Sequence, residues 1–197
     1  SDLLKGINAI DGIKRIRFIT SHPRDLSIEL IECFGNLTKL CESIHLPFQA
    51  GSDRILKSMN RGYTIEEYRK KIALLRQRCP DMAITSDCIV GFPGEGEEDF
   101  EMTMDLVKDI RFHNLFSFVY SPRKHTAASI LPDAVSRELA FERLACLQQY
   151  QKSITIEYNK SMEGRLEEVL VEDRSKNSGE EMTGRTRTNK IVNFQGS

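Results

Sequence analysis

The sequence has few of the features that mark a membrane protein, a disulfide-rich secreted protein or a dinucleotide-binding enzyme. Its 197 residues contain no apolar run near the roughly 18–20 residues that a membrane span needs, and no signal-peptide pattern. The five cysteines are an odd number without tight pairing, which is typical of a reducing compartment. CxxC, CxxxCxxC and G-x-G-x-x-G are all absent. We therefore expect a cytoplasmic protein without a membrane partner, whose cysteines are small buried side chains.

An excess of either charge is also missing. Lys and Arg together number 28 and Asp and Glu 29, which gives a net charge of −1. This balance does not indicate a nucleic-acid partner for the chain as a whole. One short segment departs from it, because residues 185–190 read Arg-Thr-Arg-Thr-Asn-Lys and contain no acid. The four histidines show no metal-ligand spacing, so the sequence predicts no metal site made by its own residues.

A strand followed by polar residues and an amphipathic helix recurs along the first part of the chain. Apolar runs predict strands at 15–20, 43–48, 83–90 and 115–120. Helical patterns occupy about 26–34, 64–79, 95–110 and 136–162. This alternation favours βαβ units in a parallel sheet, and right-handed crossovers would make it an open sheet or half of a barrel. We expect an α/β fold over residues 1–164, a partial parallel βα barrel.

The pattern changes after Gly164. Residues 166–172 read as a strand, 173–179 as a polar turn and 181–194 as further strand. Residues 165–197 therefore predict an incomplete small β domain of two or three antiparallel strands. The chain starts at Ser1 inside a helical pattern and stops just after a strand-like run, so we expect a fragment of a longer protein.

The candidate binding residues lie where the parallel strands end, because loops and helix N-termini converge there. Asp87 sits within an apolar strand, where an unpartnered acid is costly to bury. A pair of ligand hydroxyls such as those of ribose would satisfy it, and so would a neighbouring Ser, Thr or Arg in a purely structural role. Arg61, twelve residues after Gln49, lies in a glycine-containing turn. It is suited to gripping a carboxylate in bidentate fashion, although a solvated turn residue would look the same.

Five stretches, in order along the chain, resemble the MiaB-type tRNA methylthiotransferases, a branch of the radical S-adenosylmethionine superfamily. They are RIRFITSHPR at 15–24, HLPFQAGSDRILKSMNRGYT at 45–64, DCIVGFPGE at 87–95, FSFVYSPR at 116–123 and GRTRTNKIVNF at 184–194. The second and the last favour the tRNA branch over the relative that modifies a ribosomal protein. The resemblance implies the third to sixth strands of a six-stranded barrel, followed by the start of a TRAM-like domain that holds RNA.

The resemblance also implies an activity. Such enzymes add a methylthio group to C2 of N6-isopentenyladenosine, next to the anticodon. One [4Fe–4S] cluster cleaves S-adenosylmethionine reductively to a deoxyadenosyl radical, and a second cluster takes part in sulfur delivery. The CxxxCxxC that holds the first cluster is expected upstream of this chain, so we expect the chain alone to be inactive. Two alternatives stay open: a non-catalytic RNA-binding module with a scaffolding barrel, and a methylthiotransferase acting on threonyl-carbamoyl adenosine.

Similarity to another radical enzyme, the oxygen-independent coproporphyrinogen oxidase, suggests the cofactor contacts. Gln49, Arg61 and Asp87 resemble its S-adenosylmethionine ligands, with Arg61 at the methionine carboxylate and Asp87 at the ribose hydroxyls. Thr20 occupies the corresponding first-strand site, where that relative carries an acid. The family's usual Pro-Gly after Ser-Pro-Arg is replaced here by Lys124 and His125.

The resemblance assigns RNA binding to the basic segment of the β domain. Arg185, Arg187 and Lys190 would contact phosphates of tRNA, since most such contacts come from Arg and Lys. A solvated turn is the alternative explanation of the same pattern.

Overall fold

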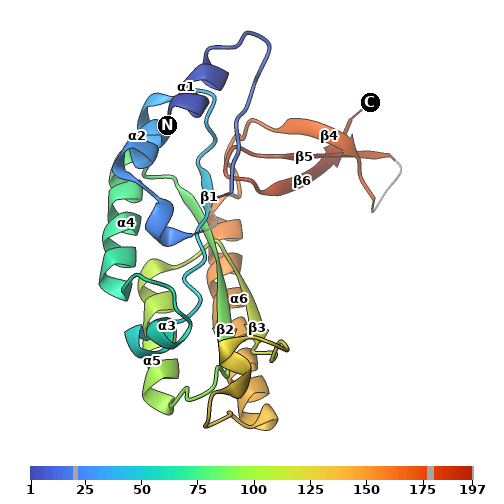
Figure 1. Ribbon diagram of the computed structural model, residues 1–197. Helices are drawn as coiled ribbons and strands as arrows, with labels where there is room; N and C mark the ends of the chain where they lie inside the picture. The colour runs from blue at the N-terminus through green and yellow to red at the C-terminus, as the bar shows by residue number, and fades with distance from the viewer. Residues whose placement is uncertain (20–21, 177–179, 197) are drawn as a thin grey trace.

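The computed structural model describes residues 1–19, 22–176 and 180–196, which form two sheets and the helices around them (Figure 1). In chain order the elements are α1 (Asp2–Asn8), the 3-10 helix η1 (Pro23–Asp25), α2 (Ile28–Asn36), β1 (Ser43–His45), α3 (Asp53–Ser58), α4 (Ile65–Arg78), β2 (Ala83–Val90), α5 (Glu97–Ile110), β3 (Asn114–Val119), the 3-10 helix η2 (Ala127–Ile130), α6 (Arg137–Ser161), β4 (Leu170–Arg174), β5 (Glu181–Arg185) and β6 (Ile191–Gln195).

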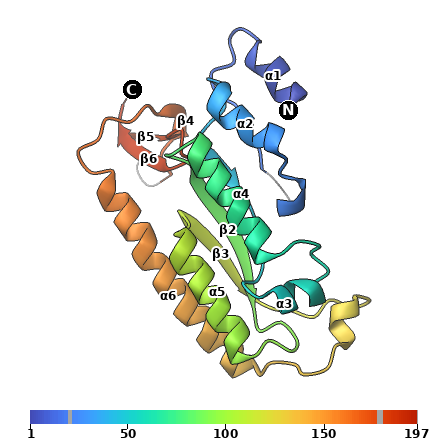
Figure 2. The same ribbon diagram turned by 90° about the vertical axis from the view of Figure 1, so that its left-hand side faces the viewer.

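The larger sheet has the order β1-β2-β3, and both of its strand pairs are parallel. Figure 2 shows α4 and α5 in front of this sheet, with α6 running alongside them. The opposite face, which would line the inside of a closed barrel, has no helix of the described chain on it (Figure 1). The expected α/β class, a partial parallel barrel followed by a small antiparallel domain, is confirmed.

Alternation along β2 decides which side chains meet the helices. Ile84, Cys88 and Val90 are buried on the helix-covered side, together with the hydroxyl of Ser86. The intervening residues, among them Asp87, are only partly buried and belong to the inner face. The expected helix starts are also present: Thr64 and Glu67 form the capping box that opens α4, as the sequence pattern indicates.

The predicted strand at 15–20 is wrong for its described residues. Only one parallel bridge forms, between Ile16 and Leu40. The arginines on either side of Ile16 turn to the β domain instead, where Arg15 donates to the carbonyl of Arg185 and Arg17 to that of Thr186. With a single bridge and side chains directed to another domain, the segment does not extend into a ladder.

The second strand is shorter than expected, because β1 ends at His45 rather than at residue 48. Pro47 lacks a backbone N–H, and Gln49 has a positive φ of 68°, so regular pairing cannot continue. One further bridge, between Gln49 and Cys88, holds the departing chain beside β2. The prediction of buried cysteines holds for four of the five, whereas Cys146 on α6 is exposed.

The small sheet has the antiparallel order β4-β5-β6. Its first strand begins at Leu170, later than the expected position 166. The expected run at 181–194 is two strands, because the chain reverses where the N–H of Thr186 donates to the carbonyl of Lys190 at 2.9 Å and Asn189 takes a positive φ. None of the described helices is long and apolar enough to cross a membrane.

Candidate functional site

The carboxyl ends of β1 and β2 bring two of the sequence-predicted residues together. The N–H of Gln49 donates to the carbonyl of Asp87 at 2.9 Å, and the N–H of Ile89 donates to the carbonyl of Gln49 at 2.8 Å. Gln49 is buried, and the Asp87 side chain keeps 30% of its surface exposed. The two residues therefore lie on neighbouring chains at the edge where parallel sheets bind ligands.

His45 is a site residue that the sequence did not single out. Its Nε2 lies 3.3 Å from Oδ1 of Asp87, and its Nδ1 is 2.9 Å from the hydroxyl of Thr85. Its ring also meets Phe116 of β3 edge-on, at 5.9 Å between centroids. Period-two alternation could have found it, since Ile44 and Leu46 face the core and leave His45 on the inner face.

Two buried polar atoms near these strand ends lack hydrogen-bond partners among the described residues. They are Nε of Arg61 and the hydroxyl of Tyr120. Tyr120 extends the β2–β3 pairing, because its N–H donates to the carbonyl of Val90, and its ring lies 5.0 Å from that of Phe92. Arg61 lies close enough to Tyr63 to lower the pKa of that phenol against the larger effect of burial, which raises it to about 12. Arg17 Nε, Arg143 Nε and Gln151 Oε1 are also without a partner among the described residues, so it is the position of Arg61 and Tyr120 near the strand ends that makes them candidate ligand contacts.

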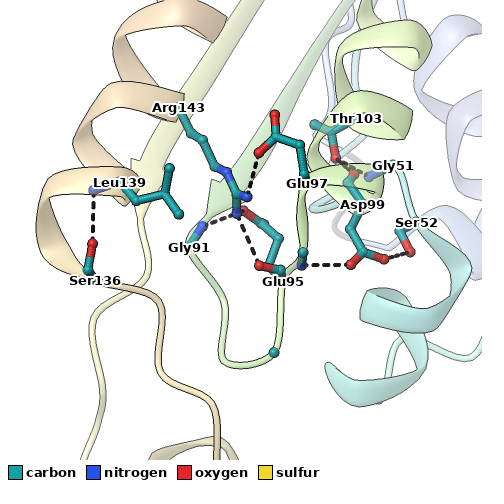
Figure 3. A network of polar contacts seen from close by, with 12 residues as sticks. Gly51, Ser52, Gly91, Glu95, Glu97, Asp99, Thr103, Ser136, Leu139 and Arg143 are labelled. Atoms are coloured by element: carbon teal, nitrogen blue, oxygen red, sulfur yellow. Dashed lines mark hydrogen bonds and ion pairs between the residues drawn. The ribbon is translucent and has the colours of Figure 1, made fainter.

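A buried ion pair fixes the loop that follows β2 (Figure 3). Nη1 of Arg143, on α6, donates to the carboxylate of Glu95 at 2.8 Å and to its backbone carbonyl at 3.1 Å. Two further hydrogen bonds complete the network. The N–H of Gly91 donates to the carboxylate of Glu95 at 2.9 Å, and Nη2 of Arg143 donates to the carboxylate of Glu97 at 3.0 Å. Burial raises the pKa of Glu95, although the Gly91 and Arg143 contacts oppose that effect.

The loop that follows β1 is attached to the start of α5 by a second set of contacts, also visible in Figure 3. Asp99 accepts from the hydroxyl of Ser52 at 2.6 Å and from the N–H of Gly96 at 2.8 Å, and it is paired with Arg54. Burial alone would raise the pKa of Asp99, but these three donors outweigh it and lower the pKa. Both loops at the ligand edge are therefore held by charged groups from neighbouring helices.

The predicted cofactor residues thus divide into three groups. Gln49 and Asp87 form the first group, because their backbones are hydrogen-bonded to each other. Arg61 lies near the segment that follows β1, since the nearby Tyr63 donates from its hydroxyl to the carbonyl of Phe48 at 2.9 Å. Thr20 lies outside the described residues.

The three predicted RNA-binding residues have different surroundings. Arg187 is committed to the barrel, since it binds Glu42 through two nitrogens, at 2.6 to 3.1 Å, and donates to the carbonyl of Leu40 at 2.8 Å. Arg185 donates to Glu172 at 3.1 Å within the β domain. Lys190 is half-buried, and burial lowers its pKa.

His113, at the amino end of β3, faces these basic residues. Its ring stacks on Tyr158 at 3.9 Å, and its Nδ1 accepts the N–H of Ile84 at 3.2 Å. Burial, followed by the charges of Lys190 and Arg76, lowers the pKa of His113 to about 4. His113 is therefore a partly buried imidazole that is neutral near pH 7.

The depressed pKa of His113 predicts acid sensitivity. A folded-state pKa of about 4 lies below the ordinary value of 6.5, so its stabilising contribution is complete above pH 6.5 and is lost as pH falls towards 4. We expect thermal denaturation to show a larger loss of stability between pH 7 and pH 5 in the wild type than in His113→Asn, which keeps an acceptor for Ile84. The exposed His125→Asn serves as control and should follow the wild type; equal pH dependence of all three would contradict the assignment.

This arrangement defines the class of protein. A parallel sheet with helices on one face and ligand-type polar groups at the strand ends is part of a βα barrel. Residues 2–107 match the family model of the radical SAM superfamily, and the chain belongs to that superfamily. Residues 160–197 match the model of the TRAM domain.

The similar curated proteins are more specific. The tRNA-2-methylthio-N(6)-dimethylallyladenosine synthase of Syntrophus aciditrophicus is 58% identical over 196 residues, covering 100% of this chain and 42% of that protein. Proteins of the same name from Syntrophobacter fumaroxidans (98% of this chain, 42% of that protein) and Geobacter metallireducens (99% and 44%) are 52% and 53% identical. The chain thus spans less than half the length of these relatives.

Among solved structures, coproporphyrinogen III oxidase (HemN) from Escherichia coli is similar, with a TM-score of 0.56. The match covers 84% of this chain and 45% of that one, at 12% sequence identity, so it bears on the fold alone.

Proposed function

We propose that the chain is the carboxyl-terminal part of a tRNA methylthiotransferase, which adds a methylthio group to C2 of N6-isopentenyladenosine next to the anticodon. The observation that carries this proposal is the 58% identity, over the whole chain, to a protein named for that product. The match of residues 160–197 to the TRAM domain supports tRNA as the partner. We propose the cytoplasm, where tRNA is modified, as its location, and the upstream part of the same enzyme as its covalent partner.

The residues at the strand ends fit S-adenosylmethionine as the cofactor. The unpaired Nε of Arg61 suits a carboxylate, which guanidinium groups bind in bidentate fashion. Asp87 touches His45 through Oδ1 only, and among the described residues nothing bonds to its Oδ2, so an acceptor remains for a ribose hydroxyl. We assign Arg61 to the methionine carboxylate, Asp87 to the ribose, and Gln49 and Thr20 to the same ligand.

The bound S-adenosylmethionine and [4Fe–4S] clusters would supply the radical chemistry, with cluster ligands from upstream of this chain. No group of three or more His, Cys, Asp or Glu within the described ranges is placed to hold a metal ion. The role of this chain is to bind and orient: Asp87 and Arg61 fix the two ends of the cofactor. The loops held by Arg143 and Asp99 keep the strand ends in place around it.

The cofactor assignment predicts that Asp87→Asn weakens S-adenosylmethionine binding by the intact protein. Losing a charged hydrogen-bond acceptor costs about 1.5–3 kcal/mol, which corresponds to roughly 10- to 150-fold in affinity. Equilibrium dialysis with labelled cofactor measures the change. Asp105→Asn on the outer surface of α5, whose side chain is 65% exposed, is the matched control. Equal affinity in both variants would rule out the role of Asp87.

The tRNA product separates the proposed activity from its alternatives. Mass spectrometry of tRNA nucleosides, from a strain whose own enzyme is replaced by the intact protein, should show the 2-methylthio derivative of isopentenyladenosine. Its appearance on threonyl-carbamoyl adenosine would move the substrate to the sister class. Absence of both, with retained RNA binding, would favour the non-catalytic module.

A further inference from the structure

A large cavity lies between the β domain and the amino ends of β2 and β3. Its volume is about 1070 Å³, and its walls come from the barrel, the end of α6 and the 185–191 turn. It opens towards the amino end of the parallel sheet, where Thr85 and His113 line it, and it also reaches Phe116, the register partner of Asp87 on β3. Asp87, Gln49 and Arg61 are not among its lining residues, so it is a separate cavity that adjoins the proposed cofactor residues.

The charges that line this cavity are mostly positive. Its cations are Arg76, Arg111, Arg165, Arg185, Arg187 and Lys190, and its acids are Glu42, Asp81 and Glu167. Three of the cations are already neutralised by carboxylates, since Arg111 pairs with Glu157, Arg185 with Glu172 and Arg187 with Glu42.

The other three cations have no carboxylate partner within 4.0 Å in the described part of the chain. They are Arg76, Arg165 and Lys190, and Arg76 donates only to the carbonyl of Ile110. Lys190 is half-buried, and its pKa is lowered by burial with no opposing acid. Beside it, the neutral ring of His113 adds no negative charge. A partly buried cation without a counter-charge is costly, and a bound anion would remove that cost.

We propose that this cavity binds phosphate groups of the RNA backbone, with Lys190, Arg76 and Arg165 as the contacting residues. The inference rests on the proposed function for the choice of RNA, and on the lining for the choice of phosphate. Guanidinium and ammonium groups are the usual phosphate ligands. The volume of about 1070 Å³ lies just above the roughly 300–1,000 Å³ typical of ligand sites and exceeds the need of a single small ion.

In this proposal the basic residues of the 185–190 segment have different roles. Arg187 joins the β domain to the barrel through Glu42 and so positions the wall of the cavity, whereas Lys190 is free to contact the ligand. Because Arg76 comes from α4 and Lys190 from the β domain, RNA bound here would touch both domains at once. The RNA surface would thus extend from the β domain onto the amino end of the barrel.

The test is the salt dependence of binding between the intact protein and an anticodon stem–loop RNA. One lost phosphate contact reduces the slope of log K against log[salt] by about 0.7–0.9, which corresponds to roughly 5- to 8-fold weaker binding at 0.1 M salt. We expect this change in Lys190→Gln. Lys190→Arg keeps the positive charge and should therefore keep the wild-type slope. A merely structural role of the lysine side chain does not predict this recovery. Lys70→Gln, on the exposed surface of α4, is the matched control for charge.

The possible outcomes distinguish RNA phosphate from a free anion. They also distinguish failure of the cavity proposal from failure of the proposed function. If Lys190→Gln and Lys70→Gln share the same slope and also bind inorganic phosphate equally, the cavity is not a phosphate site. If only inorganic phosphate binding depends on Lys190, the phosphate comes from a small anion rather than from RNA. Failure of the wild type to bind the stem–loop would refute RNA as partner, and with it both proposals; normal RNA binding with unchanged slopes refutes the cavity alone.

Discussion

Replacing Arg143 with Met is expected to lower the free energy of unfolding by about 3–5 kcal/mol, because it leaves a buried carboxylate without its cation. Arg143 and Glu95 keep only 5% and 3% of their side-chain surfaces exposed. The guanidinium carbon of Arg143 also lies 5.4 Å from the centroid of the Phe100 ring, so the loss includes this cation–π contact as well as the ion pair. Chemical denaturation of the intact protein, followed by a probe of the barrel domain, measures it.

The penalty for Arg143→Met should depend on pH in a definite direction. Burial already raises the pKa of Glu95, and removing Arg143 takes away two of the effects that oppose it. An acid whose folded-state pKa is raised contributes stability at low pH and loses it as pH rises through that pKa. The destabilisation should therefore be smaller at pH 5 than at pH 8. Arg137→Met on the same helix, where Arg137 lies over the ring of the exposed Phe141, should cost little at either pH; a similar loss in both variants would contradict the prediction.

Local patterns predicted the elements with strong local signals. The strand at 83–90 matches β2 residue for residue, because its apolar and β-branched residues are bounded by a glycine-containing turn. The start of α4 was equally clear, since the Thr64 and Glu67 capping box depends on spacing alone. Where the outcome depended on distant residues the prediction was wrong: 15–19 reads as a strand, but Arg15 and Arg17 bind carbonyls about 170 positions away.

Some residues of the candidate site could be predicted from the sequence, and others could not. Asp87 stands out in the sequence as an acid within an apolar strand, and the structure places it at the expected strand end beside Gln49. Arg143 gives no such signal, because one arginine within a long charged helix looks solvated until α6 is packed against the loop that follows β2. Its partner Glu95 lies 48 residues earlier. Residues that position a site from another element are visible only after the chain has folded.

Gly51→Ala is expected to disturb both stability and the proposed cofactor site, since the loop after β1 packs directly on α5. A Cβ at Gly51 would lie 2.3 Å from Cα of Thr103 and 2.6 Å from the carbonyl oxygen of Met102. These are backbone atoms, so the loop itself must move, at a cost of about 1–3 kcal/mol or more. The movement would break the 2.9 Å bond from the N–H of Gly51 to the hydroxyl of Thr103 and would shift Gln49, two residues earlier.

Two measurements on Gly51→Ala separate these effects. Thermal denaturation should show the lower stability, and equilibrium dialysis at a temperature where the variant is folded should show weaker S-adenosylmethionine binding than in the wild type. Gly6→Ala is the matched control, because a Cβ there meets nothing within 4 Å and alanine stabilises a helix by about 0.5–1 kcal/mol relative to glycine. If Gly51→Ala were destabilised but bound the cofactor normally, Gln49 would not be a cofactor contact whose position depends on this loop. If its stability were unchanged, the close packing of the loop on α5 would itself be wrong, because no rearrangement of flexible side chains relieves a contact between two backbones.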